Sequence, residues 1–224
     1  MNNLLKSGKV ILSLFIISLM LSSCANNGEK AKTKEAEKVT EVKKENTNTL
    51  NKIESGSVVK WRASHLGGVQ KRFGNVFIKS ASISVNDGKL SNAKVLIDMN
   101  TLTVESFPKG SDQKSDLTGH LKSGDFFDAK NYPYSKFELT SVKNISGEYN
   151  SEITGNLTIK DVTKSITFKA NLDVSDNSVT IKSEDFSIDR TDWGLKYHVE
   201  GTVGVPVNYL ISNDIGFTII MTVK

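Results

Sequence analysis

The residues best suited to acid–base or metal chemistry in this chain are its three histidines, His65, His120 and His198. They lie in separate segments, and none has a second ligand at the short spacing that metal sites use, so the sequence predicts no metal site. His120 stands close to Lys122 and Asp125 and could form an acid–base group with them. We favour the simpler interpretation, in which His120 is a polar contact that ties one segment to its surroundings.

The signatures of common enzyme classes are absent from the sequence. It contains no G-x-S-x-G, no P-loop and no dinucleotide-binding fingerprint, and its serines and aspartates have no evident base beside them. Cys24 is the only cysteine, which excludes an internal disulfide, a thiolate metal site and a cysteine nucleophile in the folded part. We therefore expect no catalytic residue and no required cofactor.

A second dense stretch is Glu184–Tyr197, in which Arg190 lies between Asp189 and Asp192 and is followed by Trp193. An arginine with acidic neighbours is usually satisfied within the protein, so we expect an ion pair at a rim or a clamp on the backbone. The functional alternative is that Arg190 faces the anionic headgroup of a ligand.

The segment Leu117–Phe137 is irregular and rich in rings. Glycines and Pro133 interrupt it, and its apolar residues follow no period of two, so it is not a strand. So many rings would be a liability in water and should fold over an apolar opening. Two interpretations remain open at this point: a plug that closes the end of a β-sheet core, which composition favours, or a partial lid over a ligand cavity.

The remainder of the chain from about residue 56 alternates between apolar and polar residues with a period of two, which is typical of strands with one buried face. Asn86-Asp87-Gly88 supplies the residues of a tight hairpin turn. Helical patterns are confined to the neighbourhood of Phe107–Lys122 and, at most, the N-terminal region. The alternation predicts eight strands, at Val59–Ala63, Asn75–Val85, Ala93–Met99, Phe137–Val142, Ile153–Ile159, Ile166–Leu172, Val179–Phe186 and Ile215–Val223.

Successive antiparallel strands with one apolar face must bury that face, either in a sandwich or in a closed barrel. The alternation does not choose between the two. Closure removes exposed edges, and eight strands enclose room for packed side chains or one elongated ligand, so the barrel is favoured.

The first 23 residues read as a secretory signal. Lys6 and Lys9 precede a short apolar run, and Leu21-Ser22-Ser23-Cys24 resembles a bacterial lipobox. That resemblance implies lipidation of Cys24 and removal of residues 1–23. A plain cleaved signal and a membrane anchor are the alternatives.

Residues 24–54 have almost no large apolar side chains, and their Lys and Glu nearly balance. We expect a disordered tether that is dispensable for folding of the domain at 55–224. Of the 29 basic residues, Lys6 and Lys9 would leave with the signal, so 27 would face 25 acidic ones. This balance gives no electrostatic reason to expect nucleic acid as a partner.

From about Gly56 to the C-terminus, the ordered set of motifs resembles the YceI-like family. The matching residues are Trp61, His65, Gly119–Asp128 (GHLKSGDFFD), Tyr132-Pro133, Phe137, Gly155–Lys160 (GNLTIK) and Ile188–Gly194 (IDRTDWG). The segment His198–Asp214 departs from the family's pattern, which leaves headgroup preference at a barrel mouth undetermined.

This resemblance implies an all-β, lipocalin-like, eight-stranded antiparallel barrel with a short helical or irregular lid. It implies a secreted or periplasmic protein that holds a long isoprenoid, such as a quinone or a polyprenyl lipid, without catalysis. With Cys24, it predicts an envelope protein anchored on the periplasmic face or the outer surface, whose oligomeric state, a homodimer included, is undetermined. The competing classes are a lipid-modifying enzyme on the same barrel and a ligand-free stress or adhesion module.

Together, the resemblance and the alternation nominate two sets of binding residues. The apolar interior and lid comprise Trp61, Ile97, Met99, Phe126, Phe127, Phe137, Leu157, Ile159, Phe168, Ala170 and Phe186. The rim or headgroup candidates are His65, His120, Arg190 and Trp193.

Overall fold

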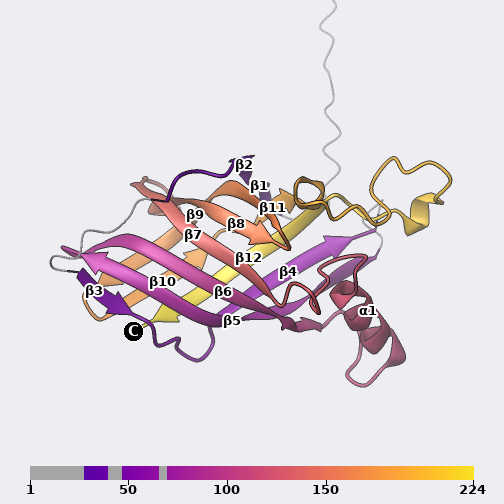
Figure 1. Ribbon diagram of the computed structural model, residues 1–224, viewed down its shortest axis with the longest axis horizontal. Helices are drawn as coiled ribbons and strands as arrows, with labels where there is room; N and C mark the ends of the chain where they lie inside the picture. Colours follow the sequence, from indigo (N-terminus) through magenta and orange to yellow (C-terminus); the bar gives the residue numbers. More distant parts are fainter. Residues whose placement is uncertain (1–27, 40–46, 66–69) are drawn as a thin grey trace, which may run out of the picture.

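The computed structural model describes residues 28–39, 47–65 and 70–224, and it shows a closed antiparallel β-barrel (Figure 1). Each strand of the ring pairs with the next, and the last pairs with the first. The predicted all-β barrel of eight strands is therefore confirmed. In order around the ring the strands are β4 (Val58–Ser64), β5 (Lys71–Asn86), β6 (Lys89–Val104), β7 (Tyr134–Asn144), β8 (Ser151–Ile159), β9 (Val162–Ser175), β10 (Ser178–Ser183) and β12 (Asp214–Val223).

The side chains follow the predicted alternation. On β8, Ile153 and Ile159 are buried, while Thr154 and Thr158 on the other face are half-buried and each meets a threonine of β9. The β5–β6 hairpin turns at Asp87 (φ 50°) and Gly88 (φ 68°), the two positive φ values of the predicted tight turn. The β8–β9 turn is formed by Lys160, which adopts the left-handed conformation (φ 56°), and Asp161, and β9 begins at Val162.

The predicted strand Val179–Phe186 is broken in two. β10 ends at Ser183, and β11 (Phe186–Asp189) continues the wall along the other half of β12. β9 pairs with β10 only from Ala170 onward. Residues 164–167 of β9 and the outer edge of β11 are not paired with each other, which leaves a gap between the two strands.

The N-terminal segment fills this gap. β1 (Glu29–Lys30) pairs in parallel with β11, and β2 (Lys32–Glu35) pairs antiparallel with residues 164–167 of β9. A further strand, β3 (Thr47–Leu50), pairs with the end of β5. The prediction of a disordered tether is therefore wrong for these residues. A polar segment can add to open sheet edges, because main-chain hydrogen bonds require no apolar side chain.

Side chains secure the same segment. Ala31 is buried in the main core cluster. The amide of Glu37 donates to Asn156 Oδ1 (2.8 Å), and Asn156 Nδ2 donates back to the Glu37 carbonyl (2.6 Å). Lys30 Nζ lies 3.0 Å from Asp214 and 3.5 Å from Asp189. Burial alone would lower the pKa of Lys30, but the hydrogen bond and charge of Asp214, aided by Asp189, outweigh it and raise that pKa.

The α-helix of the described residues is α1 (Asp112–Lys122), which falls within the predicted region; the Ser111 hydroxyl caps it by accepting from the Lys114 amide. Two short 3₁₀ helices, η2 (Arg190–Trp193) and η3 (Val207–Tyr209), follow later in the chain. Figure 1 places α1 at one end of the barrel and β3 at the other. No helix in the described part of the chain is long and apolar enough to cross a bilayer. Residues 1–23 and Cys24 lie outside the described residues.

We predict that removing β1 and β2 destabilises the barrel. A chain that begins at Lys38 would leave β9 and β11 with unpaired edges and would lose the buried Ala31. We expect this to cost about 2–4 kcal/mol and to lower the melting temperature by roughly 5–15 °C relative to a chain that begins at Gly28. Thermal unfolding followed by circular dichroism measures the difference. Equal melting temperatures would restore the interpretation of residues 28–37 as a dispensable tether.

Candidate ligand cavity

The barrel interior contains a cavity of about 180 Å³. Apart from two serines, His65 and two arginines, apolar side chains form its wall. The lining residues are Val59, Trp61, Ala63, Ser64, His65, Arg72, Val76, Ile78, Leu90, Ala93, Val95, Ile97, Met99, Leu102, Leu117, Leu121, Phe126, Phe127, Ser135, Phe137, Leu139, Ile153, Leu157, Ile159, Ile166, Phe168, Ile181, Phe186, Arg190, Ile211, Ile215, Phe217, Ile219 and Met221.

The cavity is long and narrow. Along β6 alone, the lining runs from Leu90 to Leu102. At about 3.3 Å per residue, this stretch corresponds to roughly 40 Å of strand. A small volume spread over most of the barrel's length describes a tunnel that suits an extended chain better than a compact ligand.

Nearly all predicted interior residues line this cavity, the exception being Ala170. Its side chain is fully buried within the core cluster and contributes nothing to the cavity wall. The period of two assigns a residue to the inner face of the barrel, but it does not say whether larger neighbours close over a small side chain there. Whether the lining residues contact a ligand stays a prediction.

The segment Leu117–Phe137 forms part of the cavity wall at the α1 end. Leu117 and Leu121 of α1 line the cavity, as do Phe126 and Phe127 in the turn after the helix. Three hydrogen bonds fold this turn back onto the end of α1: Phe127 to Leu121 (3.1 Å), Asp128 to Ser123 (2.8 Å) and Ala129 to Lys122 (2.9 Å). These side chains form the wall of a cavity rather than fill it, which fits the lid hypothesis better than the plug.

The rim candidates differ in position. His65 lines the cavity, and its Nδ1 lies 2.9 Å from the Asn208 carbonyl. His120 does not line it: Nε2 lies 3.0 Å from Asp125, and the ring packs edge-on against Phe126 and Tyr197. Trp193 is buried outside the cavity wall and donates to the Leu157 carbonyl (3.0 Å). Within residues 28–39, 47–65 and 70–224, no cluster of His, Cys, Asp or Glu could hold a metal ion.

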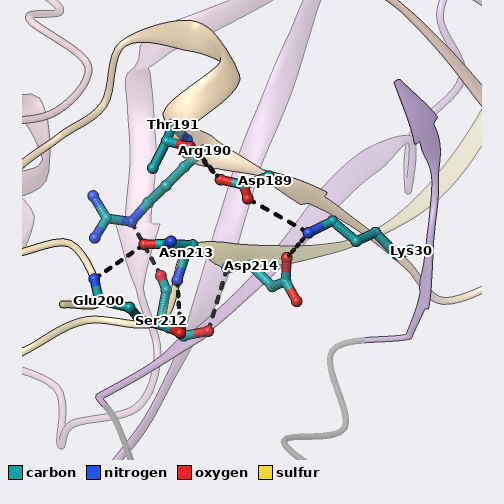
Figure 2. A network of polar contacts seen from close by, with 8 residues as sticks. All are labelled: Lys30, Asp189, Arg190, Thr191, Glu200, Ser212, Asn213 and Asp214. Carbon is teal, nitrogen blue, oxygen red and sulfur yellow. Dashed lines mark hydrogen bonds and ion pairs between the residues drawn. The ribbon is translucent and has the colours of Figure 1, made fainter. Parts of the chain in front are cut away.

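Arg190 clamps the backbone at this end of the barrel, as expected. Its guanidinium donates to three carbonyls: Nε to Ser212 (3.0 Å), Nη1 to Leu195 (2.6 Å) and Nη2 to Ile211 (3.1 Å). Figure 2 shows the surrounding polar network, with Asp189 turned toward Thr191 and Lys30 instead. Burial lowers the pKa of Arg190. The expected alternative of an ion pair does not occur, because among the described residues no carboxylate lies within 4.0 Å of this guanidinium.

Sequence reasoning missed several lining residues. On β12, Ile215, Phe217, Ile219 and Met221 recur with a period of two and could have been nominated from that pattern alone. Arg72, which sits over the Phe107 ring at 4.6 Å, gives no comparable signal.

The family model of the YceI-like domain matches residues 50–222. The UPF0312 protein of Pseudomonas putida F1 is 35% identical over 126 residues, or 54% of this chain and 59% of that protein. The chain thus spans about three fifths of the length of this relative. UPF0312 protein PA0423 of Pseudomonas aeruginosa PAO1 is 30% identical over 151 residues, or 62% of this chain and 74% of that protein.

Two solved structures are similar in fold. BcnA of Burkholderia cenocepacia has a TM-score of 0.56 at 18% identity, covering 77% of this chain and 99% of its own. A polyisoprenoid binding domain from Saccharophagus degradans, implicated in plant cell wall breakdown, has a TM-score of 0.54 at 13% identity, covering 79% and 98%. At these identities the likeness shows a shared fold.

We predict that Arg190→Lys destabilises the protein, because a single ammonium cannot reproduce the three-carbonyl clamp. The free energy of unfolding should fall by about 2–4 kcal/mol, as expected when buried acceptors lose a charged donor. Urea unfolding measures this change. Arg72→Lys, which keeps the charge at a less enclosed position, serves as the control and should shift the unfolding midpoint much less. Equal effects of the two substitutions would contradict the clamp.

Proposed function

Because the chain belongs to the YceI-like domain family, we propose that its barrel binds a long-chain amphiphile of the isoprenoid type, a quinone or a polyprenyl lipid, and stores or carries it at the cell envelope. The observation that carries this proposal is the tunnel itself, which is long, narrow and lined mainly by apolar side chains. The Saccharophagus domain, a polyisoprenoid binding domain of the same fold, supports it.

The wall chemistry suits a hydrocarbon chain. Removing apolar surface from water stabilises a complex by about 25 cal/mol per Å², so each part of an isoprenoid chain that enters the tunnel would favour binding. A hydrocarbon chain needs no charged side chain along the length of the tunnel. The polar side chains of the wall gather toward the α1 end, where His65 and Arg190 lie at the base of the loop 199–213, and a headgroup would be placed there.

Binding rather than catalysis is the role that this geometry supports. His120 and Asp125 form the closest approach to an acid–base pair, yet neither lines the cavity. Arg190 lines it with its guanidinium already engaged by three carbonyls. Besides the arginines, the titratable side chain on this wall is His65, whose Nδ1 lies 2.9 Å from the Asn208 carbonyl, and among the described residues no carboxylate lines the cavity beside it to complete an acid–base pair.

Lipidation of Cys24 would keep the domain at a membrane surface, where such ligands reside. A lipid chain adds about 0.8 kcal/mol per buried CH₂, so a diacylated cysteine anchors stably. We expect the mature chain to begin at Cys24. We also expect it to be exported across the inner membrane.

The tunnel is tested by narrowing it. Ala93 lines the cavity on β6, about nine residues from Leu102 and hence remote from the α1 end. In Ala93→Phe the ring should occupy the tunnel, so that binding of long isoprenoid quinones is lost while a short-chain quinone is still bound. Equilibrium binding with quinones of graded chain length measures this.

The neighbouring Lys94→Phe places the same ring on the outer face of the same strand and should bind all of them. Ala63→Phe, at the α1 end of the cavity, repeats the test if Ala93→Phe overpacks the wall, an effect that can cost about 1–3 kcal/mol. If Ala93→Phe and Ala63→Phe both bound long isoprenoid quinones as well as the wild type does, the proposal would be overturned.

Anchoring is tested separately. Cells fed a fatty-acid probe should label the wild-type chain and not Cys24→Ala, since Cys24 is the only cysteine. Label that persists in the variant would remove the lipoprotein claim and leave the binding claim untouched.

A further inference from the structure

The loop formed by residues 199–213 ends in an exposed apolar tip. It extends beyond the end of the barrel (Figure 1, gold). Its tip, residues 201–209 (GTVGVPVNY), carries no charged side chain. Val203 is 97% exposed, Val207 66% and Tyr209 57%, and these are half of the large apolar residues that the described chain leaves exposed. Such a concentration within seven residues is costly in water and marks a contact surface.

The base of this loop is firmly held. The Glu200 amide donates to Asn213 Oδ1 (3.2 Å), and the Asn213 amide donates to Glu200 Oε1 (3.0 Å). The Ile211 amide donates to the His198 carbonyl (2.8 Å). Figure 2 shows this base beside Arg190, whose guanidinium holds the Ile211 and Ser212 carbonyls. The apolar tip is therefore carried by a loop whose base is held in place by hydrogen bonds.

The same loop borders the tunnel. His65 Nδ1 lies 2.9 Å from the Asn208 carbonyl, and His65 forms a β-bridge with Ile211. His65 and Ile211 both line the cavity. A surface that contacts the tip consequently lies next to this end of the tunnel.

The N-terminal segment reaches the base of the loop as well. Lys30 lies 3.0 Å from Asp214, the residue that follows the loop. Five residues lie between Cys24 and Lys30, so the six steps along the chain span at most about 22 Å. A lipid attached to Cys24 would therefore lie within this distance of Lys30 and keep the adjoining part of the barrel near the bilayer.

We propose that the tip formed by residues 201–209 inserts into the interfacial layer of a lipid bilayer and seats the end of the tunnel on the membrane. Valine side chains would enter the acyl boundary, and Tyr209 would lie at headgroup level, where its ring and hydroxyl both find suitable surroundings. The purpose of this docking, exchange of a lipid between bilayer and tunnel without passage through water, rests on the proposed function; the docking itself depends on the loop alone.

The test uses the full chain, reconstituted into vesicles of phosphatidylethanolamine and phosphatidylglycerol, with an environment-sensitive fluorophore on one introduced thiol. Val203→Cys places the label on the tip, and Asp87→Cys places it on the β5–β6 hairpin at the opposite end. The parent chain, whose single cysteine is Cys24, reports any label taken up there. We expect the emission at position 203 to shift to the blue and to lose its quenching by iodide, and neither change at position 87.

Adding Val207→Ser and Tyr209→Ser to Val203→Cys should reduce the shift. Equal signals at positions 203 and 87 would overturn the proposal. A blue shift at position 203 that needs no vesicles and grows with protein concentration would also overturn it, because the tip would then contact a second copy of the chain. Since no ligand is added, failure here leaves isoprenoid binding intact, and loss of isoprenoid binding leaves this result unchanged.

Discussion

Closure of the main-chain hydrogen-bond ladder is the constraint on which the rest of this structure depends. A protein interior ordinarily holds its elements together by close packing, and an unfilled core costs stability. Here the wall is held by strand pairing around the whole ring, from β4 through β12 and back to β4. The wall can therefore stand around a tunnel. Between β9 and β11, which do not pair with each other, β1 pairs with β11 and β2 pairs with β9.

The same constraint explains what the sequence could predict. The period of two identified the eight strands, and the inward residues nominated on them line the cavity except for Ala170, because alternation is a direct consequence of the pleat. Composition could not reveal β1 and β2, because Lys32–Glu35 binds through its backbone and its side chains look like those of any solvated segment. The sequence also could not predict that Ala170 is buried in the core and does not line the cavity, since this depends on the sizes of the neighbouring side chains.

Gly155 shows how much of the tunnel's shape lies beyond periodicity. A Cβ at this position would overlap the ring of Phe137 and the carbonyl of Glu138. Because Gly155 has no side chain, the Phe137 ring, which lines the cavity, can lie against the barrel wall. The alternation indicates only that position 155 faces inward. Arg190 is the converse case: its acidic neighbours in sequence suggested an ion pair, yet its partners are carbonyls from Leu195, Ile211 and Ser212. Contacts made through the backbone at long range leave little trace in side-chain types.

In the function that we propose, the apolar interior of the barrel keeps a hydrocarbon chain out of water. This central claim is tested most directly on the protein purified from its native host, by extraction into organic solvent and mass spectrometry of the extract. We expect a polyisoprenoid lipid at close to one molecule per chain. A protein that repeatedly yields no lipid, or yields only a compact polar ligand, would contradict it.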